Sequence, residues 1–223
     1  MERALVLADG EAVTKAGLDK AWRGWSDGAG IVVAADGGAR LADPLALRLS
    51  VWVGDGDSLG SDELDELRGA GIPIELAPAD KDESDTELAV LAAVARGATD
   101  ITILGALGGR RLDHALANIA LLAHPKLQGR TARILGDRSR VTLLIGPASI
   151  KLEGRKGDLV SLLPLGDDAD GVTTGGLRFV LRDERLEAGP ARGLSNVRLG
   201  STARVEVRRG RLLIVETPAT LSS

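Results

Sequence analysis

The sequence predicts an α/β protein, with an N-terminal, mostly parallel α/β domain followed by a small C-terminal all-β sandwich. Short apolar runs alternate with segments of helical periodicity in the first two thirds of the chain. Each run is apolar throughout, which is typical of parallel strands buried on both faces of a sheet. After Ala123 the helical patterns stop and only short β-like runs follow. We therefore expect two domains, 1–138 and 139–223.

The elements of the first domain follow from apolar spacing and from residues typical of helix ends. Ser61 is expected as the N-cap of one helix, Gly97 stands where a C-terminal glycine belongs, and Pro125 follows the last helix closely. The expected strands are Leu5–Leu7, Ile31–Ala35, Val51–Val53, Ile72–Leu76 and Ile101–Leu104. The expected helices are 14–26, 61–70, Glu83–Arg96 and Leu112–Ala123.

The second domain is predicted from short β-like runs that Gly, Pro, Asp and Asn separate. Such runs without intervening helices favour a small antiparallel sandwich or barrel. The runs begin near residue 130 and are Ala132–Leu135, Val141–Ile145, Leu159–Leu163, Leu177–Leu181, Ala203–Val207 and Leu212–Val215.

The composition excludes several classes of protein. Of the 223 residues, 44% are hydrophobic and 27% charged, which supports a folded core. The net charge of −4 and the scarcity of aromatic residues argue against nucleic-acid or membrane-surface binding. The absence of cysteine excludes disulfides and thiolate chemistry, and two histidines are too few for a multi-histidine zinc site. With no signal segment or long apolar run, we expect a cytoplasmic protein.

Aspartate follows four consecutive strands of the predicted sheet, and glycine accompanies it after three of them. Because the carboxyl ends of parallel strands share one edge of a sheet, we expect these loops to form a functional site. The loops are Asp36-Gly37-Gly38-Ala39, Gly54-Asp55-Gly56-Asp57-Ser58, Asp80-Lys81-Asp82-Glu83-Ser84-Asp85 and the segment from Gly105 to His114.

The chemistry of this edge follows from its charge. Converging carboxylates repel one another, and a divalent cation relieves the repulsion; oxygen ligands without His or Cys favour Mg²⁺. Lys81 and either Arg110 or Arg111 would supply positive charge to phosphate, and glycine lets backbone N–H groups approach anionic oxygens. This is the equipment for phosphoryl or pyrophosphoryl transfer.

Structural roles stay open for some of these residues. Ser84 could equally cap the following helix, and Asp82 could serve only the helix dipole. His114 is equally well explained as a structural hydrogen-bonding group or as part of the site. Asp55-x-Asp57 partly fits a calcium loop, but Leu59 stands at a ligand position. The chain has no Gly-x-x-x-x-Gly-Lys-[Ser/Thr] motif, so a nucleotide would bind without a P-loop.

The order of motifs resembles that of the thiamine pyrophosphokinase family. The resemblance rests on 54–58, 80–85, the Gly108-Gly109-Arg110…Asp113-His114 segment and Gly193-Leu194-Ser195-Asn196, and it spans nearly the whole chain. It implies an α/β nucleotide-binding domain, a C-terminal β-sandwich and a homodimer with thiamine near the subunit interface. It also implies transfer of the terminal pyrophosphate of ATP to the hydroxyethyl group of thiamine, with release of AMP.

The resemblance assigns roles residue by residue. Asp55, Asp57 and Asp85 would bind Mg²⁺ and, with Asp82, act in catalysis. The expected substrate-binding residues are Asp57, Ser58, Ser84, Asp85, Ser195 and Asn196. The expected nucleotide-binding residues are Asp36, Gly37, Lys81, Gly108, Gly109, Arg110, Arg111, Asp113 and His114.

Three functions are therefore kept open by the sequence. The leading hypothesis is an ATP-dependent, Mg²⁺-requiring thiamine diphosphokinase. A related pyrophosphokinase would act on another heterocyclic alcohol, such as a pterin. A nucleotide-sensing binding protein would keep the site without turnover. Release of AMP on addition of thiamine and MgATP separates the first hypothesis from the other two.

Overall fold

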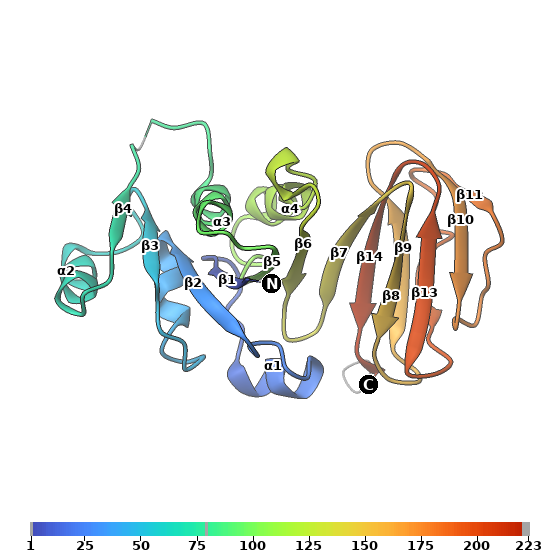
Figure 1. The fold of residues 1–223 in the computed structure, drawn as a ribbon, viewed down its shortest axis with the longest axis horizontal. Helices are drawn as coiled ribbons and strands as arrows, with labels where there is room; N and C mark the ends of the chain where they lie inside the picture. The colour runs from blue at the N-terminus through green and yellow to red at the C-terminus, as the bar shows by residue number, and fades with distance from the viewer. Residues whose placement is uncertain (1, 79, 220–223) are drawn as a thin grey trace. The chain divides into compact units, whose positions relative to one another are not determined.

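The computed structural model describes residues 2–78 and 80–219, and these form a mixed α/β fold (Figure 1). The chain divides into two compact units between Asp137 and Arg138, one residue from the expected boundary. The first unit contains, in order, β1 Arg3–Leu7, α1 Lys15–Ala21, β2 Ala29–Ala35, the 3₁₀ helix η1 Asp36–Leu41, β3 Val51–Gly54, α2 Ser61–Gly69, β4 Ile74–Leu76, α3 Asp85–Ala95, β5 Asp100–Leu104, α4 Leu112–Leu121, the 3₁₀ helix η2 Pro125–Leu127 and β6 Thr131–Leu135.

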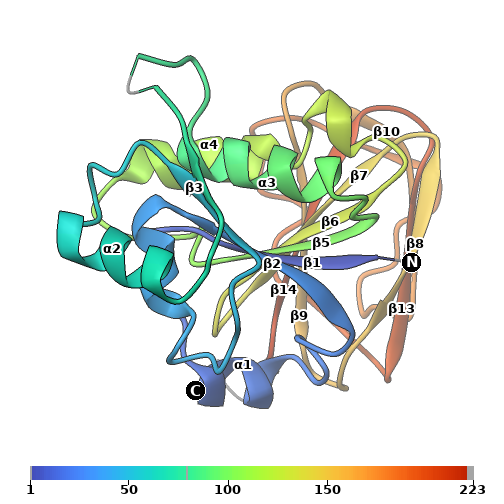
Figure 2. The ribbon, with the colours of Figure 1, turned by 60° about the vertical axis from the view of Figure 1, so that its left-hand side comes forward.

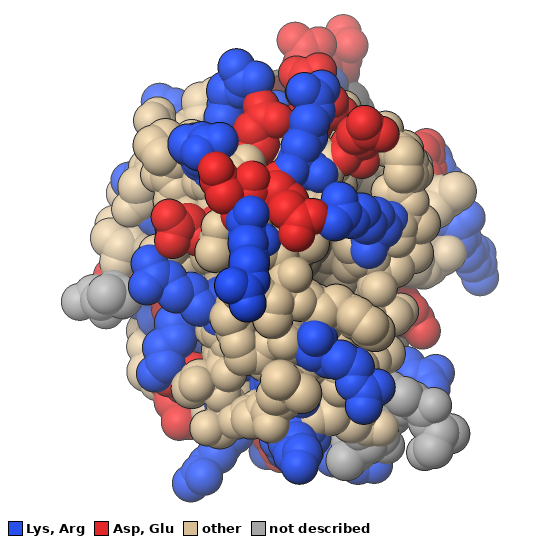
Figure 3. Space-filling model, turned by 90° about the vertical axis from the view of Figure 1, so that its right-hand side faces the viewer, with Lys and Arg blue, Asp and Glu red and all other residues tan. Residues whose placement is uncertain are grey.

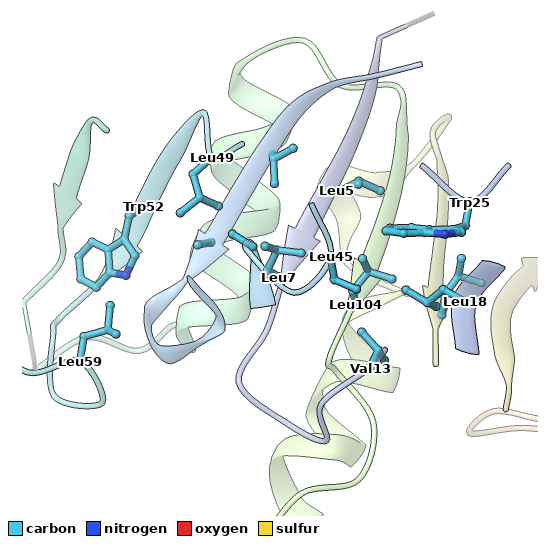
Figure 4. Close-up of a cluster of buried hydrophobic side chains, with 14 of the residues drawn as sticks. Leu5, Leu7, Val13, Leu18, Trp25, Leu45, Leu49, Trp52, Leu59 and Leu104 are labelled. Atoms are coloured by element: carbon cyan, nitrogen blue, oxygen red, sulfur yellow. The ribbon is translucent and has the colours of Figure 1, made fainter. Parts of the chain in front are cut away.

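Strands of the first unit lie side by side in the order β6-β5-β1-β2-β3-β4, and each neighbouring pair is parallel. Helices α3 and α4 run along one face of this sheet, whereas α1 lies on the other (Figure 2). The buried cluster on that side has Leu5, Leu18 of α1 and Trp25 towards one end, and Trp52 beside Leu59 towards the other (Figure 4). Burial on both faces explains the apolar runs of the central strands β1, β2 and β3, whereas the edge strand β4 contains Glu75 and the exposed Leu76.

The second unit contains two antiparallel groups of strands that share one hydrophobic core. One group has the order β12-β9-β14-β7 and the other β11-β10-β13-β8. The strands are β7 Arg140–Ile145, β8 Ala148–Glu153, β9 Leu159–Pro164, β10 Ala169–Gly175, β11 Glu184–Leu186, β12 Asn196–Val197, β13 Thr202–Val207 and β14 Arg211–Thr217.

Two helix predictions need correction at their ends. The helix expected over 14–26 is α1, which starts after Thr14 and ends at Ala21. Thr14 caps it, because its hydroxyl accepts a hydrogen bond from the Gly17 N–H at 3.0 Å. The N-cap of α2 is Gly60 rather than Ser61. The Glu63 carboxylate accepts the Gly60 N–H at 3.1 Å, so the reciprocal half of a capping box forms without a capping hydroxyl.

Two strand predictions also need correction. The run Ala132–Leu135 was grouped with the β-like runs of the second domain, although it precedes the expected boundary at 138; it lies in β6, which pairs in parallel with β5 of the first unit. The run Leu177–Leu181 was expected as a strand, but the regular strand is β10, which ends at Gly175 before a turn at Gly176 with φ +74°. Leu177 is buried, whereas Phe179 and Val180 are exposed, so this apolar run is not a core strand.

Charges on the second unit occur mainly as paired side chains. Figure 3 shows acidic and basic groups side by side on the face nearest β10 and β11. Exposed pairs of this kind contribute little to stability, but they neutralise one another locally. The pairs include Arg208 with Asp183 at 2.7 Å, Arg209 with Asp170 at 2.5 Å, and Arg185 with Asp168. Among the described residues, no helix is long and apolar enough to cross a membrane.

Candidate active site

Asp36 lies where β2 ends and η1 begins, in a conformation that few non-glycine residues adopt. Its φ is +42° and its exposed fraction is 3%. The Trp52 indole N–H donates to the Asp36 carbonyl at 3.0 Å, and the Ser58 N–H donates to Oδ2 at 3.1 Å. Oδ1 is buried and has no hydrogen-bond partner among the described residues. Such an oxygen is costly to bury unless a ligand or cation completes it.

The loop after β3 brings two more carboxylates to Asp36. The Asp57 N–H donates to Asp55 Oδ1 at 3.1 Å, which folds the loop back on itself. The Ser58 hydroxyl donates to Asp57 Oδ1 at 3.1 Å. One oxygen from each of Asp36, Asp55 and Asp57 lies within 4.8 Å of the other two. This spacing suits several oxygens directed at one hard cation.

The three carboxylates differ in their surroundings. Burial, with an opposing contribution from hydrogen bonds to Ser58 and a further increase from Asp57 and Asp85, raises the pKa of Asp36 to about 6. The hydrogen bond from Lys81 lowers the pKa of Asp55. The site therefore contains one carboxylate whose charge is disfavoured beside another whose charge is stabilised.

Lys81 lies between two of the expected metal ligands. Its ammonium is 3.0 Å from Asp55 Oδ2 and 2.9 Å from Asp85 Oδ1, and its side chain is 10% exposed. Burial lowers the pKa of Lys81, but the hydrogen bonds to Asp85 and Asp55 outweigh it and the pKa is raised overall. Lys81 is therefore charged here. The cluster of carboxylates contains Asp36 rather than the expected Asp85. Asp85 is connected to the cluster through Lys81, which pairs with both Asp85 and Asp55.

The segment from 82 to 85 leads into α3. Asp85 is the first residue of this helix, and Ser84 is its N-cap, because the Ser84 hydroxyl accepts the Glu87 N–H at 3.2 Å. The capping role that the sequence left open for Ser84 is therefore present. Asp82 is exposed beside it.

Glycines allow the loops after β1 and β5 to lie against each other. The Gly10 N–H donates to the Gly105 carbonyl at 2.7 Å, and the Glu11 N–H donates to the Leu107 carbonyl at 2.9 Å. Gly109 has φ +83°, and a Cβ there would lie 3.2 Å from Gly10. Only glycine meets both conditions without strain.

Asp9 was missed by the sequence analysis, which considered only the ends of the second to fifth strands. It follows β1, and its carboxylate lies against Gly37, where a Cβ would not fit. The signal was present in the sequence, because Asp9 also follows an apolar strand. It adds one more carboxylate near the η1 turn.

The two candidate arginines before α4 differ in their interactions. Arg111 is the N-cap of α4, and its Nε donates to Asp113 Oδ1 at 2.9 Å. This bond lowers the pKa of Asp113 and raises that of Arg111. Arg110 is exposed, and no ion pair with it is formed by the residues that the structure describes. His114 is exposed in the first turn of α4, as is Asp113.

The second unit contains the remaining expected residues, Ser195 and Asn196. Ser195 is exposed with φ +56°, and its N–H donates to the Ser161 hydroxyl at 3.0 Å. Asn196 is buried: its carboxamide accepts the Phe179 N–H at 2.9 Å and donates to the Phe179 carbonyl at 2.6 Å. Its polar atoms are thus engaged with the main chain of Phe179, and any effect of Asn196 on a ligand would pass through that segment.

Phe179 is a second residue that the sequence analysis did not select. It is the only phenylalanine in the chain, and its side chain is 63% exposed although its main chain is held by Asn196. An exposed aromatic ring on a fixed backbone can stack on a planar ligand. The sequence did offer a signal, because a single phenylalanine stands out in a chain with so few aromatic residues.

The first unit is thus an α/β protein of the class that binds ligands beyond the carboxyl ends of parallel strands. Residues 23–134 match the family description "Thiamin pyrophosphokinase, catalytic domain", and residues 148–212 match "Thiamin pyrophosphokinase, vitamin B1 binding domain". The chain therefore belongs to the thiamine pyrophosphokinase family, whose members are enzymes of the transferase class.

Individual relatives agree with this assignment. The chain is 26% identical over 165 residues to the thiamine pyrophosphokinase of Bacillus subtilis (strain 168), covering 74% of this chain and 76% of that protein. The crystal structure of thiamine pyrophosphokinase from Bacillus subtilis has a TM-score of 0.84 at 22% identity, covering 97% of this chain and 99% of that one. The structure from Geobacillus thermodenitrificans has a TM-score of 0.79 at 25% identity, covering 97% of each chain.

Proposed function

We propose that the protein transfers a pyrophosphate group from ATP to thiamine, giving thiamine diphosphate and AMP. In this proposal the α/β unit is the nucleotide-binding domain and the all-β unit is a thiamine-binding sandwich. The observation that carries the proposal is the cluster of Asp36, Asp55 and Asp57, with the unpartnered Oδ1 of Asp36 among its oxygens.

The residues fit a Mg²⁺ ion. All donors are hard carboxylate oxygens, and one of them is buried without a partner among the described residues. Asp36, Asp55 and Asp57 would hold the ion, with Asp85 as a further carboxylate next to Lys81. When bound, Mg²⁺ would neutralise charge on the phosphate oxygens.

Cationic and backbone groups would bind the rest of the triphosphate. Lys81 is charged and reaches the acidic cluster, so it can exchange a carboxylate contact for a phosphate one. Arg110 lacks a carboxylate partner among the described residues, and we therefore assign the phosphate contact to Arg110 rather than Arg111. Gly37, Gly108 and Gly109 would admit phosphate oxygens close to the backbone.

The acceptor would be bound by the second unit. The exposed ring of Phe179 offers a face for the cationic thiazolium or the pyrimidine ring of thiamine. Exposed Ser195 would contribute a hydroxyl. Phe179, Val180, Leu194 and Leu199 are all large, apolar and exposed, and they would be covered in a two-fold homodimer.

In the reaction the thiamine hydroxyl oxygen attacks the β-phosphorus of ATP. The bond from that phosphorus to the oxygen bridging it to the α-phosphorus breaks, AMP leaves with this oxygen, and the hydroxyl proton passes to water or to the carboxylate of Asp82 or Asp85. No strong base is needed if alignment and charge neutralisation dominate.

The test is to incubate the purified protein with MgATP and a panel of acceptor alcohols that includes thiamine and a hydroxymethylpterin. We expect thiamine diphosphate and AMP in equal amounts, and much lower turnover of the other acceptors. ADP formed together with a monophosphorylated acceptor would refute pyrophosphoryl transfer. Binding of nucleotide without turnover of any acceptor would refute enzymatic function.

A further inference from the structure

Arg198 is the most deeply buried charged residue of the second unit. Its side chain is 0% exposed, although it follows the short edge strand β12 directly. Nη2 donates to Glu216 Oε1 at 2.6 Å, and Nη1 donates to the Leu152 carbonyl at 2.7 Å. Glu216 belongs to β14 and Leu152 to β8, so one guanidinium bonds to strands of both sheets.

The surroundings of Arg198 leave room for its guanidinium, although Nε is buried without a hydrogen-bond partner among the described residues. A Cβ on Gly154 would lie 2.9 Å from Arg198 Nε and 2.7 Å from Asp158 Oδ2, so glycine there leaves the guanidinium its space. Glu216 is itself 3% exposed at its side chain and also accepts Arg140 Nε at 2.6 Å. Removing the Arg198 guanidinium would therefore leave this buried carboxylate with Arg140 as its remaining cationic partner.

The main chain of Arg198 pairs with the segment that contains Phe179. Arg198 forms an isolated antiparallel bridge with Leu177, and its N–H donates to the Asp158 carbonyl at 2.9 Å. On either side of it, the Arg178 N–H donates to the Val197 carbonyl and the Leu199 N–H donates to the Gly176 carbonyl, each at 2.9 Å. The Asn196 carboxamide then extends this pairing to Phe179.

We infer that Arg198 is a positioning residue for the acceptor: it fixes the paired segments 176–179 and 195–199, and through them the exposed Phe179 ring and Ser195. Neither segment has enough regular strand to hold itself, because β12 is two residues long and 177–181 lies outside the ladders. The buried guanidinium supplies the missing constraint. This inference rests on the proposed function, in which these two residues contact thiamine.

The test compares Arg198→Met, Arg198→Lys and the double variant Arg198→Met/Glu216→Met. Arg198→Met leaves Glu216 without one of its two cations and should lower Tm. The double variant also removes the buried carboxylate, so neither charge of the buried pair remains; Arg140 loses its bond to Glu216 but is 23% exposed at its side chain, and much of the Tm should return. Its KM for thiamine should nevertheless stay about tenfold above wild type, with the KM for ATP unchanged. Arg198→Lys should partly restore the thiamine KM.

Arg140→Met is the matched control, because Arg140 bonds to the same Glu216 carboxylate but lies on β7, away from both segments. It should lower Tm without changing the thiamine KM. A double variant with the wild-type thiamine KM, or an Arg140→Met effect equal to that of Arg198→Met, would overturn the inference.

Amide hydrogen exchange supplies a readout that needs no turnover. In the double variant the N–H groups of Phe179, Arg178 and Leu199 should exchange at least tenfold faster than in wild type, while those of β13 keep their protection. Unchanged exchange at these three sites would refute positioning. If the wild-type protein turns over no thiamine, the proposed function fails, and the exchange result still decides the role of Arg198.

Discussion

The Asp36→Asn variant should lose most of its turnover. In the absence of metal, its stability relative to wild type should be greater at neutral pH than in acid. Burial raises the pKa of Asp36 from 3.8 to about 6, a shift of about 2 units. At 1.36 kcal/mol per unit, ionising this carboxylate costs the folded state about 3 kcal/mol. Since the pKa is raised on folding, the protonated group contributes stability that is fully present below about pH 4 and is lost as the pH rises through 6.

Asparagine has no such titration, but it brings a cost of its own. The amide nitrogen would take the place of the unpartnered Oδ1, where it is buried without a hydrogen-bond acceptor. This costs roughly 1–3 kcal/mol at every pH. The stability of the variant relative to wild type should therefore rise by about 3 kcal/mol from pH 3 to pH 7.5. For a chain of this size that corresponds to roughly 6–12 °C in relative Tm.

The assay is thermal unfolding in EDTA at several pH values, repeated with Mg²⁺, together with the rate of AMP release. Mg²⁺ should raise the Tm of wild type more than that of the variant, because binding to the folded state stabilises it by mass action. Turnover should fall at least about 10²-fold. A stability difference that does not change with pH, or equal stabilisation of both proteins by Mg²⁺, would refute the reasoning.

Four further outcomes are expected. Asp57→Asn should cut turnover at limiting Mg²⁺ by at least about 10²-fold, because it removes one of the three clustered carboxylates; near-normal turnover would remove Asp57 from the site. Arg110→Ala should raise the KM for ATP several-fold more than Arg111→Ala, and steady-state kinetics giving the opposite order would reassign the phosphate contact. His114→Ala should cost much less turnover than Asp55→Ala, and a larger loss would indicate that His114 acts as a general base. Light scattering at micromolar concentration should give a dimer, and a fully active monomer would contradict the proposed assembly.

The acidic edge could be predicted because it depends on topology alone. Once the runs around Leu5, Ile31 and Val51 are taken as parallel strands, the loops that follow them must meet at one edge. The structure does bring Asp36, Asp55 and Asp57 together. The position of Lys81 between Asp55 and Asp85 could not be predicted in this way, because it depends on the path of the long loop before α3.

The second unit was harder to predict because some of its strands contain no continuous apolar run. β8 alternates exposed and half-buried residues and has a single buried one, Leu152, so it offers no apolar run. β10 is rich in Thr, Gly and Asp and was overlooked in favour of 177–181. That run is apolar, but Phe179 and Val180 face outward, and apolar content cannot distinguish a surface segment from a core strand.

The hydrogen bonds between Asn196 and position 179 involve only main-chain atoms of the phenylalanine. Any residue with a backbone N–H can make them, so only proline is excluded by these contacts. The backbone at this position is therefore independent of the side chain that it presents. A single codon change at 179 can alter the surface offered to a ligand without disturbing the fold. This makes position 179 a natural starting point for evolution, or for design, of a different acceptor preference.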